Sequence, residues 1–450
     1  MFRSINPYTG EVIQEYRGHF EQQVEEILGE LAEGQKEWGS SPLSDRTSLF
    51  LRLADELEQR KQELALLATL EMGKPISQAI AEIEKCAWLC RHYSSEATSI
   101  LSSRVIATDA AHSDVRYQPL GLILGIMPWN YPYWQAFRFF VPALIAGNAC
   151  LLKHASNVTG CALAIEAVLH AVGIPKDVFR SVIIAGKEAS SLISDRRISG
   201  VSLTGSTDAG RKVGAKAGKN IKPSVLELGG SNAFIVTDSA DLDLAVDQAL
   251  VGRFQNNGQS CIAAKRLLVH DSISSKFEEA FIAKVKNFLV SDPMDPDCDI
   301  GPVARKDLAE ELQEQMQRSV DKGARLVVGG RVKDALFSPT VLTQVRPGMP
   351  AFDEETFGPM AAITTFSNIE EAITLSNTSE FGLGVSVFTS NPDEILEQAH
   401  RFQDGALFVN SIVKSDPRLP FGGTKVSGYG RELAEEGMLA FVNRQTIYVS

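Results

Sequence analysis

Short apolar runs that alternate with helical patterns are the feature of this chain that most restricts its fold. The rhythm begins near residue 115, with an apolar run at 121–127, a helical segment at 134–146 and a second run at 150–153. These runs are apolar at successive positions, which predicts strands that are buried on both faces. Such strands belong to parallel sheets covered by helices on both sides. We therefore expect an α/β fold that binds its ligands at the carboxyl ends of the strands.

The same pattern divides the chain into two lobes. The first lobe is expected to contain a further helix and two further strands, at 158–172, 182–184 and 200–203. After residue 240 the alternation restarts and runs to about residue 410, beginning with a helix, a strand and a helix at 241–255, 266–270 and 273–289. No low-complexity linker separates the lobes. We therefore expect them to pack together, with Glu227 at their junction and Cys261 at the start of the second lobe.

Long amphipathic helices precede the first lobe. Residues 20–38 and 45–102 carry apolar side chains at helical spacing. Cys86 and Cys90 lie one helical turn apart within the second segment. Because neither a His-x-x-x-His pair nor a double Cys-x-x-Cys motif accompanies them, we interpret them as part of a buried helix face and expect no metal site.

Composition restricts the partners and the compartment. The chain has 450 residues, 44% of them hydrophobic and 22% charged, which is ordinary for a globular enzyme. Its net charge of −12 argues against nucleic acid and anionic membranes as partners. Residues 1–7 lack the apolar core of a signal peptide, and the apolar stretch 139–152 is interrupted and too short to span a bilayer. Six cysteines are too few for a disulfide framework. We expect a cytosolic protein with reduced cysteines.

One cysteine stands in a setting that suits nucleophilic catalysis. Cys261 follows an Asn-Gly turn at 257–258 and precedes a run of small apolar residues. Upstream, Glu227 ends an apolar segment, and two glycines follow at 229–230. A thiol and a separate carboxylate base, each next to a small-residue turn, are components of covalent catalysis. An isolated cysteine is more often a small buried hydrophobe, so the other segments must decide between the two interpretations.

A turn bounded by prolines follows the first strand. Pro128 and Pro132 restrict its backbone, and Asn130 provides an amide donor at the carboxyl end of the sheet. An uncharged donor suits the stabilisation of an oxyanion, because it adds no charge that must lose its hydration. The alternative is a rigid turn in which Asn130 caps the following helix.

Two more strand ends offer groups that suit a nucleotide. Gly205 and Ser206 open a helix after a strand, where backbone N–H groups hold phosphates, although the spacing is not that of the dinucleotide fingerprint. Lys153 ends another strand, with Ser156 three residues later. This pair could hold a ribose phosphate, and a solvated strand end is the alternative.

Taken in order, these segments resemble the aldehyde dehydrogenase superfamily. The motifs are Pro-Trp-Asn, Gly-Ser-Thr, Glu-Leu-Gly-Gly, Gly-Gln-Ser-Cys, Glu-Thr-Phe-Gly-Pro and Pro-Phe-Gly-Gly, at 128–130, 205–207, 227–230, 258–261, 355–359 and 420–423. The resemblance begins at Asn-Pro-Tyr-Thr-Gly, residues 6–10, and reaches the final strand.

This resemblance implies three structural units. A Rossmann-like cofactor domain would comprise 1–102 and 121–235, and an α/β catalytic domain would comprise 236–425. A hairpin at 103–120 and the tail 426–450 would form a small β oligomerisation extension in a homodimer or a dimer of dimers. From composition alone, the terminal strand 446–450 either pairs with another subunit or closes a sheet of its own chain.

The resemblance also implies the reaction. Cys261 would attack an aldehyde to form a thiohemiacetal, whose oxyanion Asn130 and the Cys261 N–H would stabilise. Loss of hydride to the nicotinamide would leave a thioester, and Glu227 would activate water to release the acid. The residues implied in cofactor binding are Trp129, Lys153, Ser156, Gly205, Ser206, Leu228, Glu355 and Phe357.

Ser156 predicts NADP as the preferred cofactor and NAD as a weaker one. In NAD-preferring relatives this position is often glutamate, which repels a 2′-phosphate. Serine is neutral and can donate a hydrogen bond beside Lys153. His154, the residue after Lys153, opposes the NADP prediction, because many NADP-linked relatives have proline at that position.

Arg138 and Ser415 predict the substrate. Both match positions at which succinate semialdehyde dehydrogenases hold the far carboxylate of their substrate. A buried arginine needs an anionic partner, either that carboxylate or a fixed acid of the protein. Gln255 stands where some relatives have a second arginine. We expect oxidation of succinate semialdehyde to succinate, and the alternative is a dehydrogenase of other small aldehydes such as glutarate semialdehyde. A non-catalytic protein is a third possibility, which the presence of all three expected catalytic residues opposes.

Overall fold

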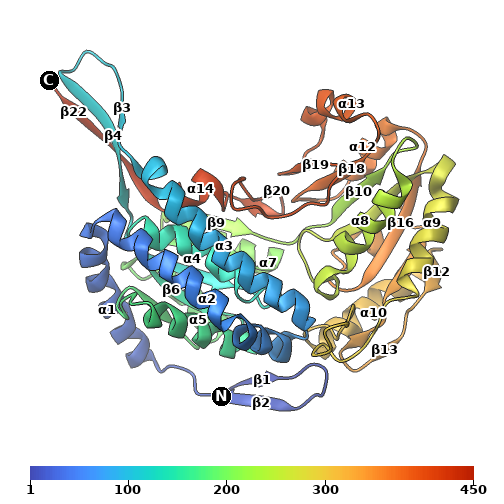
Figure 1. The fold of residues 1–450 in the computed structure, drawn as a ribbon, viewed down its shortest axis with the longest axis horizontal. Helices are drawn as coiled ribbons and strands as arrows, with labels where there is room; N and C mark the ends of the chain where they lie inside the picture. Colours follow the sequence, from blue (N-terminus) through green and yellow to red (C-terminus); the bar gives the residue numbers. More distant parts are fainter.

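Two open sheets form the two lobes of the molecule, and the computed structural model describes residues 1–450 (Figure 1). The first sheet has six strands in the order β21-β9-β8-β5-β6-β7. All neighbours in it are parallel except β21, which runs antiparallel to β9. Its strands are β5 (Leu122–Met127), β6 (Ala149–His154), β7 (Phe179–Ser181), β8 (Ile198–Thr204), β9 (Ser224–Glu227) and β21 (Gly428–Tyr429).

Helices cover both faces of this sheet, as strands that are apolar on both faces require. Ile123 packs into one hydrophobic core and its neighbour Leu124 into the other. The first core is covered by α2 (Leu43–Met72), α3 (Ile76–Leu101), α4 (Trp134–Ile145) and α5 (Thr159–Ala171). The second is covered by α1 (Glu21–Ser40), α6 (Gly186–Leu192) and α7 (Thr207–Lys219). The α/β fold predicted from the alternating pattern is confirmed.

The second lobe contains a seven-stranded sheet in the order β12-β15-β16-β11-β10-β18-β19, in which only β12 is antiparallel to its neighbour. Its strands are β10 (Asn232–Val236), β11 (Ala264–His270), β12 (Arg325–Val328), β15 (Thr340–Thr343), β16 (Met360–Phe366), β18 (Val385–Phe388) and β19 (Leu407–Val409). The helices of this lobe are α8 (Leu242–Phe254), α9 (Asp271–Val285), α10 (Lys306–Asp321), α11 (Pro350–Asp353), α12 (Ile369–Asn377) and α13 (Pro392–Glu397).

A three-stranded sheet projects from the first lobe and ends at the carboxyl terminus (Figure 1). In it, β4 (His112–Pro119) lies between β3 (Arg104–Val105) and β22 (Val442–Val449), and both pairings are antiparallel. The terminal strand therefore pairs within its own chain, which was one of the two alternatives. The remaining short elements are β1 (Phe2–Ile5), β2 (Val12–Tyr16), η1 (Ser156–Val158), η2 (Gln255–Gly258), β13 (Val332–Lys333), β14 (Leu336–Phe337), β17 (Phe381–Gly382), η3 (Ala399–Arg401), β20 (Thr424–Lys425) and α14 (Ala434–Leu439).

Two expected elements differ from the structure. The segment 45–102 is two helices, because Gly73 adopts a left-handed backbone (φ 77°) that ends α2 and Pro75 precedes α3. The strand expected at 182–184 lies at 179–181. Ile183 leaves the sheet because its N–H and C=O both bond to His19, at 3.0 and 2.9 Å.

The other expected helices and strands quoted above lie within a few residues of their predicted positions. Cys86 and Cys90 are fully buried on α3, as the helix-face interpretation predicted. None of the helices has both the length and the apolar character that a bilayer-spanning segment requires. The functional division into domains stays a prediction.

Candidate active site

The turn before Cys261 is built from residues that tolerate a left-handed backbone. Asn256, Asn257 and Gly258 have φ values of 57°, 54° and 70°, a conformation that asparagine and glycine adopt more readily than other residues. The buried Asn257 amide holds this turn in place. Its Nδ2 donates to the carbonyls of Gly73 and Pro302, at 2.8 Å each, and its Oδ1 accepts from a backbone N–H. The Asn-Gly signal in the sequence thus marks a rigid turn that positions the thiol.

Asn130 lies against the same turn. Its Nδ2 donates to the carbonyl of Gln259 at 3.1 Å, and Asn256 donates to the Asn130 carbonyl at 2.8 Å. The helix-cap alternative is wrong, because α4 begins at Trp134 and has no side-chain cap. The Glu82 carboxylate accepts the first N–H groups of that helix instead. An amide carries two hydrogens, so one remains for an oxyanion next to Cys261.

Glu227 ends β9 as a buried carboxyl group without a hydrogen bond to either oxygen. Burial raises its pKa well above the ordinary value; Arg138 opposes this effect and Glu432 adds to it. The backbone carbonyl of Glu227 accepts from Gly205 N at 3.0 Å, which ties the start of α7 to this strand end. A carboxylate with a raised pKa is a stronger base, which suits a general base.

Gly229 and Gly230 allow three segments to meet behind the thiol. A Cβ atom on Gly229 would overlap Glu355 Oε2, and one on Gly230 would overlap the Cys261 carbonyl oxygen. Only residues without side chains permit these approaches. The two glycines after Glu227 therefore have a structural reason that the sequence alone did not give.

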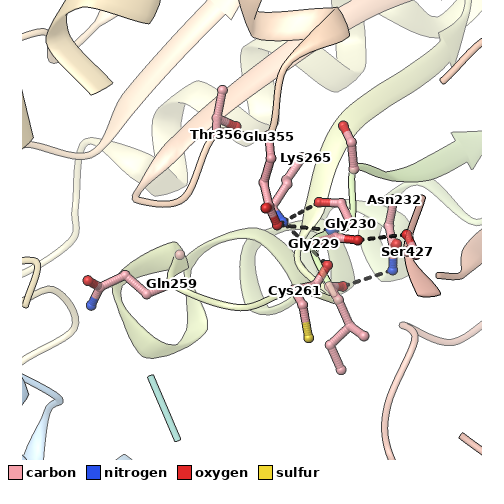
Figure 2. A network of polar contacts seen from close by, with 12 residues as sticks. Gly229, Gly230, Asn232, Gln259, Cys261, Lys265, Glu355, Thr356 and Ser427 are labelled. Carbon is pink, nitrogen blue, oxygen red and sulfur yellow. Dashed lines mark hydrogen bonds and ion pairs between the residues drawn. The ribbon is translucent and has the colours of Figure 1, made fainter. Parts of the chain in front are cut away.

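Lys265 joins the same three segments through its ammonium group (Figure 2). It is fully buried and lies 2.6 Å from Glu355 Oε1, while donating to the carbonyls of Gly230 and Cys261. Gly230 N also donates to Glu355 Oε1, at 3.0 Å. These contacts to Oε1 orient the Glu355 carboxylate. Its Oε2 has no hydrogen bond and remains available for a ligand. Sequence reasoning missed Lys265.

Cys261 itself is a half-buried free thiol. Burial raises its pKa to about 11, although the positive charges of Arg138 and Lys265 oppose this shift. The thiol is therefore protonated at neutral pH in the free protein, and a base must accept its proton before it attacks.

A cavity of about 200 Å³ opens beside the thiol. It is lined by Cys261 and by residues of α3, α4 and the loop that precedes Phe421. Arg138 and Ser415 both line it, so the structure brings the two predicted substrate residues to the nucleophile. The size suits a small aldehyde.

Arg138 is fully buried and already has an acidic partner. Its guanidinium forms an ion pair with the buried Glu432 and lies 4.5 Å from the centre of the Phe421 ring. The fixed acid that the sequence left open as an alternative is thus present. Arg138 contributes a positive field to the cavity, but its charge is compensated within the chain.

Ser415 is paired with a cation that the sequence reasoning missed. Its Oγ accepts a hydrogen bond of 2.9 Å from Lys85 Nζ, and Lys85 also lines the cavity. Lys85 lies one turn after the buried Glu82 on the otherwise apolar face of α3. Glu82 and Lys85, two charged residues on an otherwise apolar helix face, were the feature of the sequence that could have indicated this site.

Most of the expected cofactor residues, together with the expected catalytic residues Asn130 and Glu227, lie at the carboxyl ends of neighbouring strands of the first sheet. Glu355 and Phe357 instead precede β16 in the second lobe. Asn130, Lys153, Gly205 and Glu227 follow or end β5, β6, β8 and β9, which are adjacent in the sheet. This is the edge at which parallel sheets bind ligands. The Trp129 and Phe357 rings stand edge to face at 5.6 Å.

The ends of β6 and β8 carry the groups expected near phosphates. Ser206 caps α7, with its Oγ accepting from Ala209 N at 3.3 Å, and Leu228 packs against the glycine of that first turn. Lys153 has no acidic partner within ion-pair distance, and burial lowers its pKa. Ser156 is exposed at the start of η1.

His154, which opposed the NADP prediction, faces the interior. Its Nε2 lies 2.7 Å from the Pro132 carbonyl, and its Nδ1 accepts from Ala155 N at 2.9 Å. Burial lowers its pKa to about 4, so the ring is neutral at physiological pH. It connects the end of β6 to the proline-bounded turn.

Comparison with known proteins agrees with this geometry. Residues 1–447 match the Aldehyde dehydrogenase family. A probable succinate-semialdehyde dehydrogenase [NADP(+)] of Synechocystis sp. is 45% identical, with 99% of each chain covered. A succinate semialdehyde dehydrogenase [NAD(P)+] of Escherichia coli is 42% identical over 99% of this chain and 97% of its own. The crystal structure of succinic semialdehyde dehydrogenase from Streptococcus pyogenes in complex with NADP+ has a TM-score of 0.97 at 35% identity, with both chains fully covered.

Proposed function

Because the chain belongs to the aldehyde dehydrogenase family, we propose that it oxidises succinate semialdehyde to succinate, with NADP as the preferred cofactor and NAD as a weaker one. The observation that carries the proposal is the cavity beside Cys261, which is lined by Arg138, Lys85 and Ser415. A small cavity with a nucleophile and positive charge suits a short aldehyde that carries a carboxylate. The names of the relatives point to the same substrate.

The first half of the reaction forms a covalent adduct on Cys261. Its thiol must lose a proton, and Glu227, directly or through a water, is the carboxylate that we assign as acceptor. The thiolate then adds to the aldehyde carbon, and the negative charge moves to the carbonyl oxygen. The free amide hydrogen of Asn130 and the Cys261 N–H donate to that oxygen and stabilise the tetrahedral adduct.

The second half releases the acid. Loss of hydride from the adduct leaves a thioester on Cys261. Glu227 first releases the thiol proton to solvent and then accepts a proton from water, which attacks the thioester. The C–S bond breaks, and the proton on Glu227 passes to the departing sulfur and regenerates the thiol. The two unpartnered carboxyl oxygens of Glu227 and its raised pKa support both proton transfers by this one group.

The residues at the strand ends fit a nicotinamide dinucleotide, which supplies the hydride acceptor when bound. Glu355 Oε2 has no hydrogen bond and would hold a ribose hydroxyl, with Phe357, Trp129 and Leu228 as the apolar contacts. Gly205 and Ser206 would hold the pyrophosphate at the start of α7. The remaining expected contacts are Lys153 and Ser156.

We assign the cofactor preference to Lys153 and Ser156. The Lys153 ammonium has no acidic partner, and the exposed Ser156 hydroxyl places no negative charge beside it. A 2′-phosphate would therefore gain a cation and a hydrogen-bond donor without meeting a carboxylate. Ser156→Glu is expected to reverse the preference towards NAD.

Absorbance at the band of the reduced cofactor tests the proposal. Wild type is supplied with succinate semialdehyde, glutarate semialdehyde or butanal, each with NADP and with NAD. The highest kcat/KM is expected for succinate semialdehyde with NADP, and Cys261→Ala should abolish turnover of every aldehyde. A preference for butanal would reject the proposed substrate and leave a general aldehyde dehydrogenase.

We also propose that the protein is a cytosolic homodimer or dimer of dimers. The support is the projecting sheet, where Val105, Tyr448 and Val449 are 69%, 53% and 51% exposed (Figure 1). Apolar side chains on a projecting sheet suit burial against a second copy. Light scattering on wild type and on a chain lacking residues 442–450 would test this, and a monomeric wild type would reject it.

A further inference from the structure

The charges that line the cavity beside Cys261 are unequally compensated. Arg138 is ion-paired with Glu432. Glu82, the acidic side chain of the lining, is ion-paired with the buried Lys74 and accepts two backbone N–H groups. Lys85 is partly buried and has no carboxylate within ion-pair distance. Lys414 also lines the cavity without an ion pair, but it is exposed to solvent. Lys85 is therefore the sheltered cation that the fold leaves without an anion.

The contacts of Lys85 aim its ammonium into this cavity. Nζ donates to Ser415 Oγ at 2.9 Å and lies 4.2 Å from the centre of the Trp134 ring. An ammonium carries three hydrogens, so two remain for a ligand. The Ser415 hydroxyl accepts from Lys85 and keeps its own hydrogen for donation.

The surrounding charged groups do not satisfy Lys85. Arg138 on α4 repels Lys85, whereas Glu82 on α3 and Asp416, next to Ser415 in the chain, attract it. Cys86 on α3 is also near, but burial raises the pKa of its thiol well above the usual value, so it is uncharged. Asp416 is bound by Arg418 at 2.7 Å, and Glu82 by Lys74. A partly buried charge without a partner destabilises a protein, and such groups are kept mainly where a ligand supplies the partner.

We propose that Lys85, together with Ser415, binds the far carboxylate of the aldehyde substrate and so determines specificity for a semialdehyde acid. The inference rests on the proposed function, because it assumes a substrate with that carboxylate. Two N–H donors of Lys85 and the Ser415 O–H would form charge-assisted hydrogen bonds to its oxygens. Arg138 remains bound to Glu432 and adds a positive field from the cavity wall.

The test compares Lys85→Met with Lys61→Met in the full-length protein. Lys61 carries the same charge on the neighbouring α2, where it is ion-paired at the surface with Glu58 and Glu84. For Lys85→Met, kcat/KM for succinate semialdehyde is expected to fall about 10- to 100-fold, since a hydrogen bond to a charged group contributes that much. Turnover of butanal should stay within about twofold, because Cys261 chemistry does not use the lysine. Lys61→Met should leave both values unchanged.

Thermal unfolding separates a binding role from a structural one. Replacing an uncompensated charge by an apolar side chain of similar length should leave the melting temperature of Lys85→Met equal or higher. A lower melting temperature with equal losses for both aldehydes would overturn the inference. If wild type prefers succinate semialdehyde and Lys85→Met keeps that preference, the inference also fails while the proposed function stands. If wild type prefers butanal, the proposed function itself has failed.

Discussion

Replacing Arg138 by methionine should destabilise the protein far more than the same replacement at an exposed arginine. The Arg138 side chain is 2% exposed and that of Glu432 is 5% exposed, so their ion pair has almost no access to water. After the substitution, Glu432 keeps one neutral contact, a 3.3 Å hydrogen bond from Ser202 Oγ. A buried carboxylate is then left without a cation.

The expected magnitude follows from that unpaired charge. Breaking a buried ion pair from one side costs about 3–5 kcal/mol, because the remaining charge has lost both water and its partner. Loss of the contact between the guanidinium and the Phe421 ring is a smaller part, about 0.5–2 kcal/mol. We therefore expect Arg138→Met to lower the free energy of unfolding by about 3–5 kcal/mol.

A double-mutant cycle with Glu432→Gln isolates the pair. Urea unfolding is followed by tryptophan fluorescence and by circular dichroism, and the two signals must coincide before free energies are compared. Arg138→Met/Glu432→Gln should be less destabilised than the sum of the single variants, by at least about 2 kcal/mol. Additive effects, or a loss below about 1 kcal/mol for Arg138→Met, would refute the reasoning. The result also decides whether an Arg138 variant is a usable probe of substrate binding.

Three further predictions concern the chemistry. Glu227→Gln should lower steady-state kcat about 10²- to 10⁴-fold and also slow the first turnover, because the Cys261 thiol loses its proton acceptor and the thioester loses the base that activates water. Rapid-quench kinetics measures the first turnover, and wild-type kinetics would contradict the assignment. Lys265→Met should weaken cofactor binding about tenfold or more, because Glu355 loses a charge-assisted hydrogen bond; fluorescence titration gives the dissociation constant, and an unchanged value would assign Lys265 to folding alone. Burial lowers the pKa of Lys85 to about 8, so its ammonium is charged below that pH and neutral above it. The ratio of kcat/KM for succinate semialdehyde to that for butanal should therefore fall as pH rises through 8, since the titration of Cys261 affects both substrates and cancels; a ratio independent of pH would oppose a charged Lys85.

The sequence identified the residues whose positions are set by local structure. Asn130 and Glu227 follow strands that were recognisable as apolar runs, and parallel topology brings such strand ends to one edge. The left-handed turn before Cys261 was indicated by its Asn-Gly pair, because few other residues adopt that backbone. In these cases the residues of a short segment determine its local structure, so the segment can be recognised from the sequence alone.

The sequence did not identify pairs that form only when distant segments meet. Lys85 and Ser415 are 330 residues apart, and Lys265 and Glu355 are 90 apart. No local pattern reports which acid or hydroxyl a lysine will meet from a distant part of the chain. The displaced strand has the same origin, since Ile183 leaves the sheet to bond to a histidine from the N-terminal region.

The three charged groups around the thiol differ in how far the fold satisfies them, and this difference bears on function. Arg138 is compensated by Glu432, yet its field acts on both uncompensated neighbours: it opposes the burial that raises the pKa of Glu227, and it adds to the burial that lowers that of Lys85. Arg138 has its counter-ion within the chain, although its Nε and Nη2 have no hydrogen-bond partner. Lys85 has no counter-ion and gains one only when an anionic ligand binds. Burial of Glu227 and Lys85 thus costs the free protein stability, and proton transfer to Glu227 or carboxylate binding at Lys85 would offset part of that cost.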